Sequence, residues 1–573
     1  MKKSSDGDTN PEATFHPGKG KRTARTRPKG RIADPKAADE VRSTLGEEHR
    51  RRDLLLEYLH ALQDRFGNLS LARLAALAEE MNLSLVKVYE VASFYHNFNI
   101  IREGEKSGTQ RTIRVCDSLP CMLRGSRKLL DSLTRDGDAG VKVIRAACMG
   151  RCDQAPVARL DQTYVGRAST ETVAAALASG PVEAAVPEYR DYDTYIRDDG
   201  YRLLSASKEG ITTTEEIFSA LDHSGLRGLG GAGFPAGRKW RLVAEQPGPR
   251  LMVVNCDESE PGTFKDRHYL LTDPHRVLEG MLIGARSIEA TDIYIYIRDE
   301  FPEVRAVVMQ ELGQLADAGL VGVPGGPEVH LRRGAGSYIC GEESAMLESI
   351  EGKRGLPRHR PPFPAQVGLF GRPTLINNVE TLYWVRDIIE QGPDWFAFQG
   401  VNGSKGLRTY SVSGQVRNPG VVLAPAGTTA RQLIDEHCGG MADGHAFKAY
   451  LPGGASGGIL PQSLADLPLD FGTLDEHGCF IGSAAIIVLS DQDSIRDVVL
   501  NLTRFFENES CGQCTPCRFG TEKAASLMAE GTWDAACMED LAACMESASI
   551  CGLGHAAANP IRSAYRYFPE EMA

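Results

Sequence analysis

The stretch Glu509-Ser-Cys-Gly-Gln-Cys-Thr-Pro-Cys-Arg518 carries three cysteines, Cys511, Cys514 and Cys517, at C-x2-C-x2-C spacing. Three thiolates this close in sequence can bind one [4Fe–4S] cluster when a distant cysteine supplies the fourth ligand. A structural zinc site is the alternative, although zinc sites more often use separated C-x2-C pairs. The stretch therefore predicts a protein that moves single electrons. Spacing alone leaves three candidates for the fourth ligand: Cys537, Cys544 and Cys551.

Length and composition exclude several protein classes. The 573 residues predict about three or four domains at roughly 150 residues each. The sequence has no run of about 20 apolar residues and no apolar signal core, so we expect a cytoplasmic protein without direct membrane insertion. In a reducing compartment, the 14 cysteines are expected to be metal ligands rather than disulfides. A net charge of −12 disfavours general nucleic-acid binding.

The N-terminus differs from the rest of the chain in charge. Residues 1–36 carry ten Lys or Arg against four Asp or Glu, a balance of +6. High charge and low apolar content predict a disordered basic tail over residues 1–40. Such a tail could lie along an acidic partner or remain solvated.

Changes in hydrophobic periodicity predict an α/β multidomain fold. A helical bundle is expected over 48–110, in which Ser70 and Ser84 cap two helices. An α/β unit over 111–180 and a linker over 181–200 follow. Residues 195–400 alternate strands, such as 251–254 and 293–297, with helices, such as 275–289 and 301–316, which predicts a layered parallel sheet. A small β-containing domain over 406–490 and a helical domain over 493–573 complete the chain.

Two further cysteine pairs lie in the first α/β unit. Cys116 and Cys121 follow its first predicted strand, and Cys148 and Cys152 follow a later one. Four thiolates from two loops suit a [2Fe–2S] cluster, which takes two ligands on each iron. Four-cysteine zinc sites have similar spacing, so the pattern alone leaves zinc open.

A family resemblance bears on this choice. The run Val88-Tyr-Glu-Val-Ala-Ser-Phe-Tyr-His-Asn-Phe98, followed by these pairs, resembles the thioredoxin-like [2Fe–2S] subunit of the NADH-dehydrogenase module of respiratory complex I. The resemblance covers about residues 48–178 and implies a thioredoxin-like domain over 111–180. All four ligand positions of that family are present. The resemblance therefore implies a [2Fe–2S] cluster on Cys116, Cys121, Cys148 and Cys152 rather than zinc.

A glycine-rich segment indicates close approach of the backbone to a ligand. Six glycines lie between Gly225 and Gly237, and Gly228-Leu-Gly-Gly-Ala-Gly233 matches G-x-G-x-x-G. Such glycines let amide N–H groups reach a phosphate or a flat ring. A conventional dinucleotide fingerprint follows a strand, whereas residues 213–223 have a helical pattern, which disfavours a standard Rossmann site. A plain flexible loop is the alternative.

The neighbours of this loop favour a cofactor pocket. Phe234 offers an apolar face for a ring, and Lys239 offers a cation for phosphate. The strand 251–254 ends at the edge where open α/β sheets bind ligands. The polar residues that follow it are Asn255, Asp257, Glu258, Ser259 and Glu260. Two more polar clusters are Tyr338-Ile-Cys-Gly-Glu-Glu343 and Ile376-Asn-Asn-Val-Glu-Thr381.

Taken together, these segments resemble the flavin-bearing subunit of the same complex I module over residues 195–565, which implies a Rossmann-like FMN/NAD domain. The matching segments are 228–240, 255–267, 338–343, 361–364, 373–381 and 511–518. The implied FMN contacts are Gly228, Gly230, Gly231, Gly233, Lys239, Asn255, Asp257, Glu258, Ser259, Tyr338, Gly341, Glu342, Asn377, Asn378 and Thr381. The implied NAD contacts are Phe234, Lys239, Glu260, Glu343 and Phe363. Two positions depart from the family pattern, Leu229 for arginine and Leu242 for an aromatic residue, and both bear on nucleotide affinity.

The same resemblance selects the fourth cluster ligand. Ser549-Ile-Cys-Gly-Leu-Gly554 matches the family's fourth-ligand motif. It implies a [4Fe–4S] cluster on Cys511, Cys514, Cys517 and Cys551. Cys256, Cys340, Cys438 and Cys479 are assigned to packing.

These parts imply a path for electrons. NAD(H) exchanges two electrons as hydride and iron–sulfur clusters exchange one, whereas FMN can do either. The expected cofactors are therefore FMN, NAD, one [4Fe–4S] cluster and one [2Fe–2S] cluster, and no catalytic side chain is expected. The expected order is NAD(H), FMN, the [4Fe–4S] cluster and then a partner. The [2Fe–2S] cluster would be a side station or a second exit.

The fusion of both segments in one chain resembles the β subunit of molybdenum- or tungsten-dependent, NAD-linked formate dehydrogenases. That resemblance implies a heteromer in which an α subunit, with a molybdenum or tungsten cofactor and further iron–sulfur clusters, oxidises formate while this chain reduces NAD⁺. The alternatives are the diaphorase subunit of a bidirectional NAD-reducing hydrogenase, a fused complex I component and a non-catalytic iron–sulfur scaffold.

Overall fold

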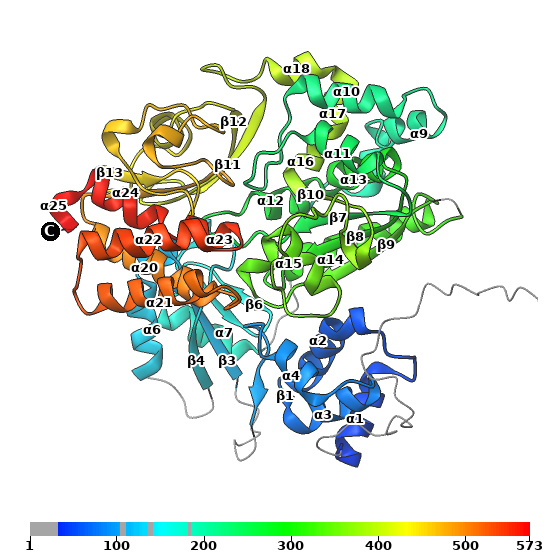
Figure 1. The fold of residues 1–573 in the computed structure, drawn as a ribbon, viewed down its shortest axis with the longest axis horizontal. Helices are drawn as coiled ribbons and strands as arrows, with labels where there is room; N and C mark the ends of the chain where they lie inside the picture. Colours follow the sequence, from blue (N-terminus) through cyan, green and yellow to red (C-terminus); the bar gives the residue numbers. More distant parts are fainter. Residues whose placement is uncertain (1–32, 103–110, 136–140, 181–184, 325, 573) are drawn as a thin grey trace, which may run out of the picture.

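The computed structural model describes residues 33–102, 111–135, 141–180, 185–324 and 326–572. Its units combine helices with mixed and parallel sheets, so the predicted α/β multidomain fold is confirmed (Figure 1). The basic cluster from Lys19 to Arg31 lies outside the described residues. Helix α1 begins at Pro35, inside the stretch predicted as tail, because Asp34 caps it. The Asp34 carboxylate accepts from the Ala37 N–H at 3.1 Å.

The N-terminal helices form a bundle against the domain that contains Gly334. Ser70 and Ser84 cap two of them as predicted, accepting from the N–H groups of Arg73 and Lys87. The bundle contacts its neighbour through His60, whose Nε2 lies 2.9 Å from the Gly334 carbonyl. Its elements are α1 (Pro35–Leu45), α2 (Leu55–Phe66), α3 (Leu71–Glu80), α4 (Leu85–Ala92), β1 (Leu69–Ser70) and β2 (Ile100–Ile101).

The next unit is a four-stranded sheet in the order β4-β3-β5-β6. Strand β3 pairs in parallel with β4 and antiparallel with β5. Cys116 ends β3, and Cys148 and Cys152 follow β4. The elements are β3 (Arg111–Cys116), β4 (Val141–Ala146), β5 (Ala158–Leu160), β6 (Thr163–Val165), α5 (Leu119–Leu123), α6 (Ser126–Arg135) and α7 (Thr170–Ser179).

The predicted linker, 181–200, is more than a spacer in its described part. It contains helix α8 (Tyr192–Arg197), which Asp191 caps. Tyr195 is fully buried, and its hydroxyl donates to Glu279 at 2.6 Å. This segment therefore packs as part of the domain that follows it.

That domain is built on a parallel sheet in the order β10-β7-β8-β9, as the alternation of strands and helices predicts. Asn255 at the end of β7 pairs with Asn378 at the end of β10, so their polar termini meet at one edge. The strands are β7 (Arg250–Cys256), β8 (Ala290–Ile297), β9 (Glu328–Arg333) and β10 (Thr374–Asn378). The helices are α9 (Arg202–Lys208), α10 (Thr214–Ser224), α11 (Ala236–Ala244), α12 (Lys265–Thr272), α13 (Pro274–Ser287), α14 (Pro302–Asp317), α15 (Glu343–Ile350), α16 (Val379–Tyr383), α17 (Val385–Gln391) and α18 (Pro393–Ala397).

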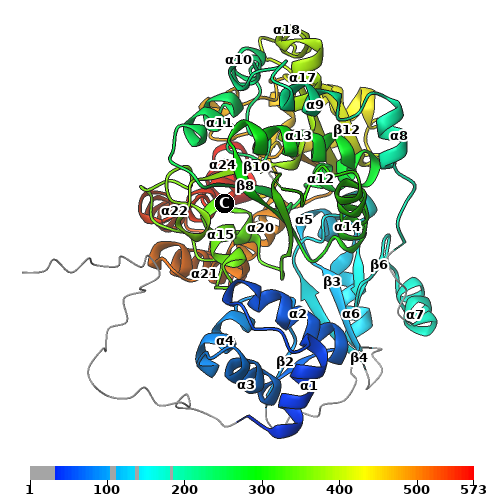
Figure 2. The same cartoon turned by 90° about the vertical axis from the view of Figure 1, so that its right-hand side faces the viewer.

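The last two units lie side by side (Figures 1 and 2). A five-stranded mixed sheet has the order β12-β11-β15-β13-β14. The C-terminal helices contact this sheet through α24, and they contact the β4-β3-β5-β6 unit through α20. The strands are β11 (Leu407–Gly414), β12 (Gly420–Pro425), β13 (Phe447–Leu451), β14 (Leu460–Pro461) and β15 (Ala485–Ser490), with α19 (Ala430–Gln432). The helices are α20 (Ile495–Glu509), α21 (Thr515–Ala529), α22 (Ala535–Ala548), α23 (Gly552–Ala556), α24 (Asn559–Tyr567) and α25 (Pro569–Met572). Within the described ranges, no helix is both long and apolar enough to cross a membrane.

Two helical glycines give a matched test of the packing. A Cβ on Gly280 in α13 would lie 2.0 Å from the Leu382 carbonyl oxygen of α16, whereas a Cβ on Gly313 in α14 would meet nothing within 4 Å. We expect Gly280→Ala to lower the free energy of unfolding by about 1–3 kcal/mol through overpacking. Gly313→Ala should raise it by about 1 kcal/mol, because alanine favours the helix. Urea unfolding followed by circular dichroism measures both, and equal effects would contradict the close α13–α16 contact.

Candidate functional site

A cavity of about 310 Å³ opens at the carboxyl ends of β7 and β10. The predicted cofactor residues that line it are Gly230, Asn255, Asp257, Glu258, Ser259, Glu260, Tyr338, Gly341, Glu342 and Asn378. They come from the glycine loop, the end of β7, the short 3₁₀ helix Tyr338–Gly341 and the end of β10. The fold thus brings together segments that are separated by up to 148 residues, from Gly230 to Asn378.

Two asparagines fix the walls of this cavity. Asn255 Nδ2 donates to the Gly341 carbonyl at 2.9 Å, and its Oδ1 accepts from the Asp257 N–H at 3.0 Å. Asn378 caps α16 by accepting from the Glu380 N–H at 3.0 Å. Each side chain therefore ties the end of a strand to the segment beside it.

The glycine loop lies between α10 and α11 rather than after a strand, which agrees with the expectation against a standard Rossmann loop. The Leu229 N–H donates to Thr381 Oγ1 at 2.9 Å, which anchors the loop to α16. A Cβ on Gly230 would lie only 3.0 Å from Asn378 Cβ, so the backbone approaches this asparagine closely. Leu229 itself is buried in the apolar core, whereas Leu242 is 39% exposed.

Buried carboxyl groups dominate the electrostatics. Burial raises the pKa of Asp257 to about 8 and that of Glu260 to about 7. Burial, reinforced by Asp266, raises the pKa of Glu258 to about 8. Glu260 accepts from the Tyr338 hydroxyl and from the Ser456 N–H, the latter at 2.8 Å.

The sequence interpretation did not include several lining residues. Lys265 is fully buried in the cavity wall, where its Nζ lies 2.8 Å from Asp266 and 2.9 Å from Glu380. Burial acts to lower the pKa of Lys265, but Asp266 and Glu380 outweigh it and raise the pKa. Lys265 could have been identified from the sequence, because it lies inside segment 255–267, which resembles the flavin-bearing subunit. Other lining residues outside the predicted set are Ala232, Thr263, Asp266, Ile339, Ser483, Gly552 and Leu553.

Other predicted residues lie behind or beside the cavity. Gly228, Gly231, Gly233, Lys239, Asn377 and Thr381 are not part of its lining. Asn377 is buried and accepts from the Trp240 indole N–H at 3.0 Å, so it supports α11. Their roles as FMN contacts stay predictions.

Apart from Glu260, which lines the cavity, the predicted nucleotide residues are more exposed. Phe234 and Phe363 are 41% and 51% exposed. Lys239 and Arg360 both pair with Glu343, at 3.6 and 3.0 Å. Arg360 was not predicted, although it immediately precedes the matched segment 361–364.

The four N-terminal cysteines lie together and are all buried. Cys148 Sγ lies 3.5 Å from Cys152 Sγ. Cys148 also interacts with Cys116, which in turn interacts with Cys121. The two predicted pairs therefore converge from the loops after β3 and β4.

The C-terminal cysteines converge in the same way. Cys517 interacts electrostatically with Cys514, Cys551 and Cys511. Cys551 is buried and belongs to the same core cluster as Cys517, whereas Cys544 on α22 is exposed. Of the three candidates left open by spacing, the fold thus brings Cys551 to the triplet.

The donor sets fit the groups that they are expected to hold. Each cysteine set offers four thiols that converge from separate loops, as an iron–sulfur cluster requires. In the cavity, Asp257 Oδ2 is buried without a hydrogen-bond partner. Such an acceptor suits the hydroxyl groups of a polar ligand.

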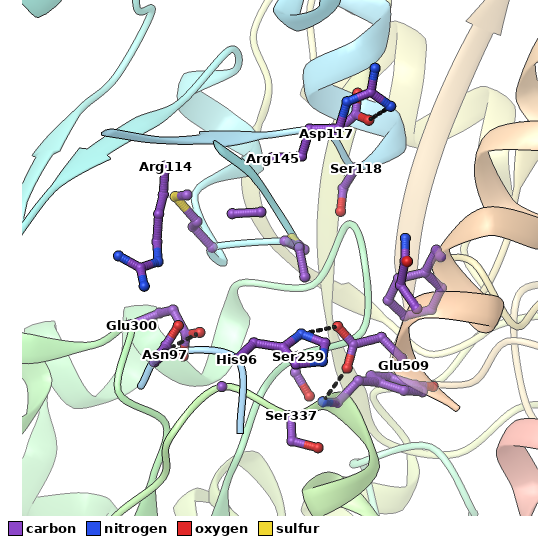
Figure 3. Close-up of a pocket in the computed structure, with 18 of the residues that line it drawn as sticks. His96, Asn97, Arg114, Asp117, Ser118, Arg145, Ser259, Glu300, Ser337 and Glu509 are labelled. Atoms are coloured by element: carbon purple, nitrogen blue, oxygen red, sulfur yellow. Dashed lines mark hydrogen bonds and ion pairs between the residues drawn. The ribbon is translucent and has the colours of Figure 1, made fainter. Parts of the chain in front are cut away.

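A second cavity, of about 510 Å³, adjoins the first (Figure 3). Asp257, Ser259 and Tyr338 line both cavities. Arg114 points into it from β3, and His96 faces Glu509 with Nδ1 3.7 Å from Oε1. Cys148 also lines it, so this cavity lies between the first cysteine set and the cofactor pocket.

Four family models match the chain. They are the thioredoxin-like [2Fe–2S] ferredoxin over 41–180, the Nuo51 FMN-binding domain over 221–387, the SLBB domain over 409–460 and the NADH-ubiquinone oxidoreductase-F iron–sulfur binding region over 497–573. The matches agree with the cofactors expected from the sequence.

Relatives and solved structures agree with these models. An F subunit of the NADH-quinone oxidoreductases of Rhizobium meliloti is 41% identical over 399 residues, which is 68% of this chain and 94% of the relative. The corresponding F subunit of Aquifex aeolicus is 39% identical over 401 residues, 68% and 92% of the two chains. A chain of an NAD⁺-reducing [NiFe]-hydrogenase in the H₂-reduced state has a TM-score of 0.78 at 31% identity, covering 91% of this chain and 92% of that one. The protein belongs to the family of NADH-quinone oxidoreductase F subunits and is an NADH-dehydrogenase subunit with FMN, NAD, one [2Fe–2S] cluster and one [4Fe–4S] cluster.

Proposed function

We propose that this chain is the diaphorase subunit of a heteromeric NAD-linked oxidoreductase. When bound, FMN would exchange hydride with NAD(H) and single electrons with the iron–sulfur clusters. The observation that carries the proposal is the composition of the 310 Å³ cavity wall. This wall contains Gly552 and Leu553, which directly follow Cys551.

The proposed ligand sets follow from the two groups of converging cysteines. Cys116, Cys121, Cys148 and Cys152 would hold the [2Fe–2S] cluster. Cys511, Cys514, Cys517 and Cys551 would hold the [4Fe–4S] cluster. The contacts within each group support the assignment.

The pocket residues would bind and orient the cofactors without proton chemistry of their own. Asp257 would accept from ligand hydroxyls through its free Oδ2, and Asn378 and the Gly230 backbone would confine the flavin from the other side. Phe234 and Phe363, with the ion pairs of Glu343, would receive the nucleotide.

For the partner, we propose a formate dehydrogenase α subunit with a molybdenum or tungsten cofactor, so that this chain delivers electrons from formate to NAD⁺. The proposal rests on the resemblance of the fused chain to the β subunits of such enzymes. A second candidate is the diaphorase subunit of an NAD-reducing hydrogenase. The match to a hydrogenase chain over 91% of this chain favours that candidate.

Cysteine variants test the diaphorase proposal. We expect Cys551→Ser to lose [4Fe–4S] iron and the transfer of electrons to the partner, because a thiolate ligand is missing. NADH oxidation with ferricyanide should persist, since that acceptor can take electrons from the flavin. Iron analysis, electron paramagnetic resonance (EPR) spectroscopy and the ferricyanide assay measure these effects.

The matched control is Cys544→Ser, which removes an exposed thiol of the same segment and should leave all three readouts unchanged. Full cluster content in Cys551→Ser would exclude Cys551 as a ligand. A wild-type chain that holds FMN but does not oxidise NADH with ferricyanide would favour the non-catalytic scaffold.

The raised pKa of Glu260 predicts a pH-dependent stability. Its folded pKa, about 7, exceeds its ordinary value of 4.5 because of burial, so between these values the folded state binds more protons than the unfolded state. The contribution of Glu260 to the free energy of unfolding is fully present below pH 4.5. It falls as the pH rises to 7, by about 1.4 kcal/mol per pH unit. Glu260→Gln, which mimics the neutral acid, should remove this component. The difference between the two urea-unfolding profiles measures it, and parallel profiles would contradict the assignment.

Metal analysis of the native complex tests the partner. Because the proposed α subunit carries molybdenum or tungsten, we expect one of these metals to co-purify with the tagged chain. Nickel in its place would support the hydrogenase candidate and reject formate dehydrogenase. Plasma mass spectrometry of the purified complex, with an untagged strain as control, makes the measurement.

A further inference from the structure

One buried arginine joins two loops that belong to different units. Arg298 directly follows β8, and only 4% of it is exposed. Its Nη2 donates to the Cys148 carbonyl at 2.6 Å, and its Nη1 donates to the Glu258 carbonyl. Cys148 belongs to the proposed [2Fe–2S] ligand loop, and Glu258 belongs to the wall of the FMN cavity. A single guanidinium therefore spans both loops.

The ligand loop rests directly on the segment that contains Arg298. Gly150 has a φ of +65°, and a Cβ there would lie 2.6 Å from the Phe301 ring and 3.4 Å from Arg298 Nη1. The Phe301 ring centroid lies 5.2 Å from the guanidinium carbon. The loop thus has no free space in which to move towards β8.

A second link closes the connection into a ring. Glu258 Oε2 accepts from the Arg267 N–H at 3.1 Å, and the Arg267 guanidinium donates to Asp153 Oδ1 at 3.1 Å. Asp153 follows the last cysteine of the ligand loop, Cys152. Because Arg298 forms the other half of this ring, neither loop can shift without disturbing the other.

The charge of Arg298 also bears on the cluster. Its Nε lies 3.2 Å from Glu300 Oε2, and Glu300 accepts from Asn97 Nδ2 at 3.1 Å. A buried cation beside a cluster ligand stabilises the extra negative charge of the reduced cluster. Loss of the cation would also remove the ion-pair partner of Glu300. Both changes make the surroundings more negative and lower the reduction potential.

We propose that Arg298 is a positioning residue that clamps the [2Fe–2S] ligand loop to the wall of the FMN cavity and raises the reduction potential of that cluster. The proposal rests on the proposed ligand set. It explains why a buried cation lies where two units meet.

The test compares Arg298→Gln and Arg298→Lys with the control Arg333→Gln in the holoprotein. Arg333 is partly buried and pairs with Asp299 at 2.7 Å, but its bonds go to Asp299 and Asp64 rather than to either loop. EPR-monitored redox titration measures the [2Fe–2S] potential. Hydrogen exchange with mass spectrometry measures opening of segments 147–153 and 257–267.

At a fixed solution potential, we expect Arg298→Gln to raise the oxidised-to-reduced ratio of the [2Fe–2S] cluster at least tenfold. A tenfold change corresponds to a fall of 59 mV in the reduction potential of this one-electron couple. Exchange should accelerate at least tenfold in both segments. Arg298→Lys keeps the charge but cannot bridge two carbonyls, so its potential should stay near the wild-type value while exchange accelerates. Arg333→Gln should change neither readout.

Three results would overturn the proposal. The first is that Arg298→Gln keeps the wild-type reduction potential and the wild-type exchange rates. The second is that Arg333→Gln shifts the potential as much as Arg298→Gln does. If Arg298→Gln does not fold, wild-type exchange in Arg298→Lys decides against the clamp. A wild-type protein without a [2Fe–2S] signal would overturn the ligand set as well, whereas a normal signal with an unmoved potential removes only the role of Arg298.

Discussion

The structure depends on the burial of carboxylates at the end of β7. Asp257, Glu258, Glu260 and Asp266 lie within ten residues, and each is at least largely buried. An isolated buried carboxylate costs several kcal/mol unless it gains hydrogen bonds or a charge partner. Glu258 obtains them from the N-terminus of α12. Glu260 obtains them from Tyr338 of its own domain and from Ser456 of the five-stranded β unit, so another unit contributes to the stabilisation of the acidic loop.

The same loop carries the apolar contacts that seat the remaining units. Phe264 packs against Cys148 and Cys152, while its N–H donates to Ser411 of β11 at 3.0 Å. Thr263 meets Ser483 at 2.6 Å. Ten residues of chain therefore contact the thioredoxin-like unit, the β unit and the cofactor cavity. Fixed contacts of this kind suit electron transfer, because the cofactors must keep their relative positions through each turnover.

The sequence predicted those features that local spacing encodes. The triplet Cys511, Cys514 and Cys517 and the caps Ser70 and Ser84 depend on residues within a few positions of one another, so pattern and chemistry are enough. Spacing alone did not select the fourth ligand, because the α22 segment before Cys551 also carries Cys537 and Cys544. The prediction of Cys551 came from the resemblance of residues 549–554 to the family motif, and in the fold Cys551 is buried whereas Cys544 is exposed.

Long-range contacts explain what the sequence could not predict. Lys265 and Arg298 were not predicted because their decisive contacts are tertiary: Lys265 pairs with Glu380, 115 positions away, and Arg298 donates to Cys148, 150 positions away. Tyr195 lies where the predicted linker, 181–200, overlaps the predicted domain, 195–400, and the fold buries it against Glu279. The anchor at Tyr195 has a physical consequence for the junction. It shortens the connection between the thioredoxin-like unit and the flavin domain. A shorter connection raises the effective concentration of one unit in the neighbourhood of the other. Their polar interface, including the buried Arg159–Asp299 pair at 3.0 Å, can then stay closed although buried ion pairs add little net stability.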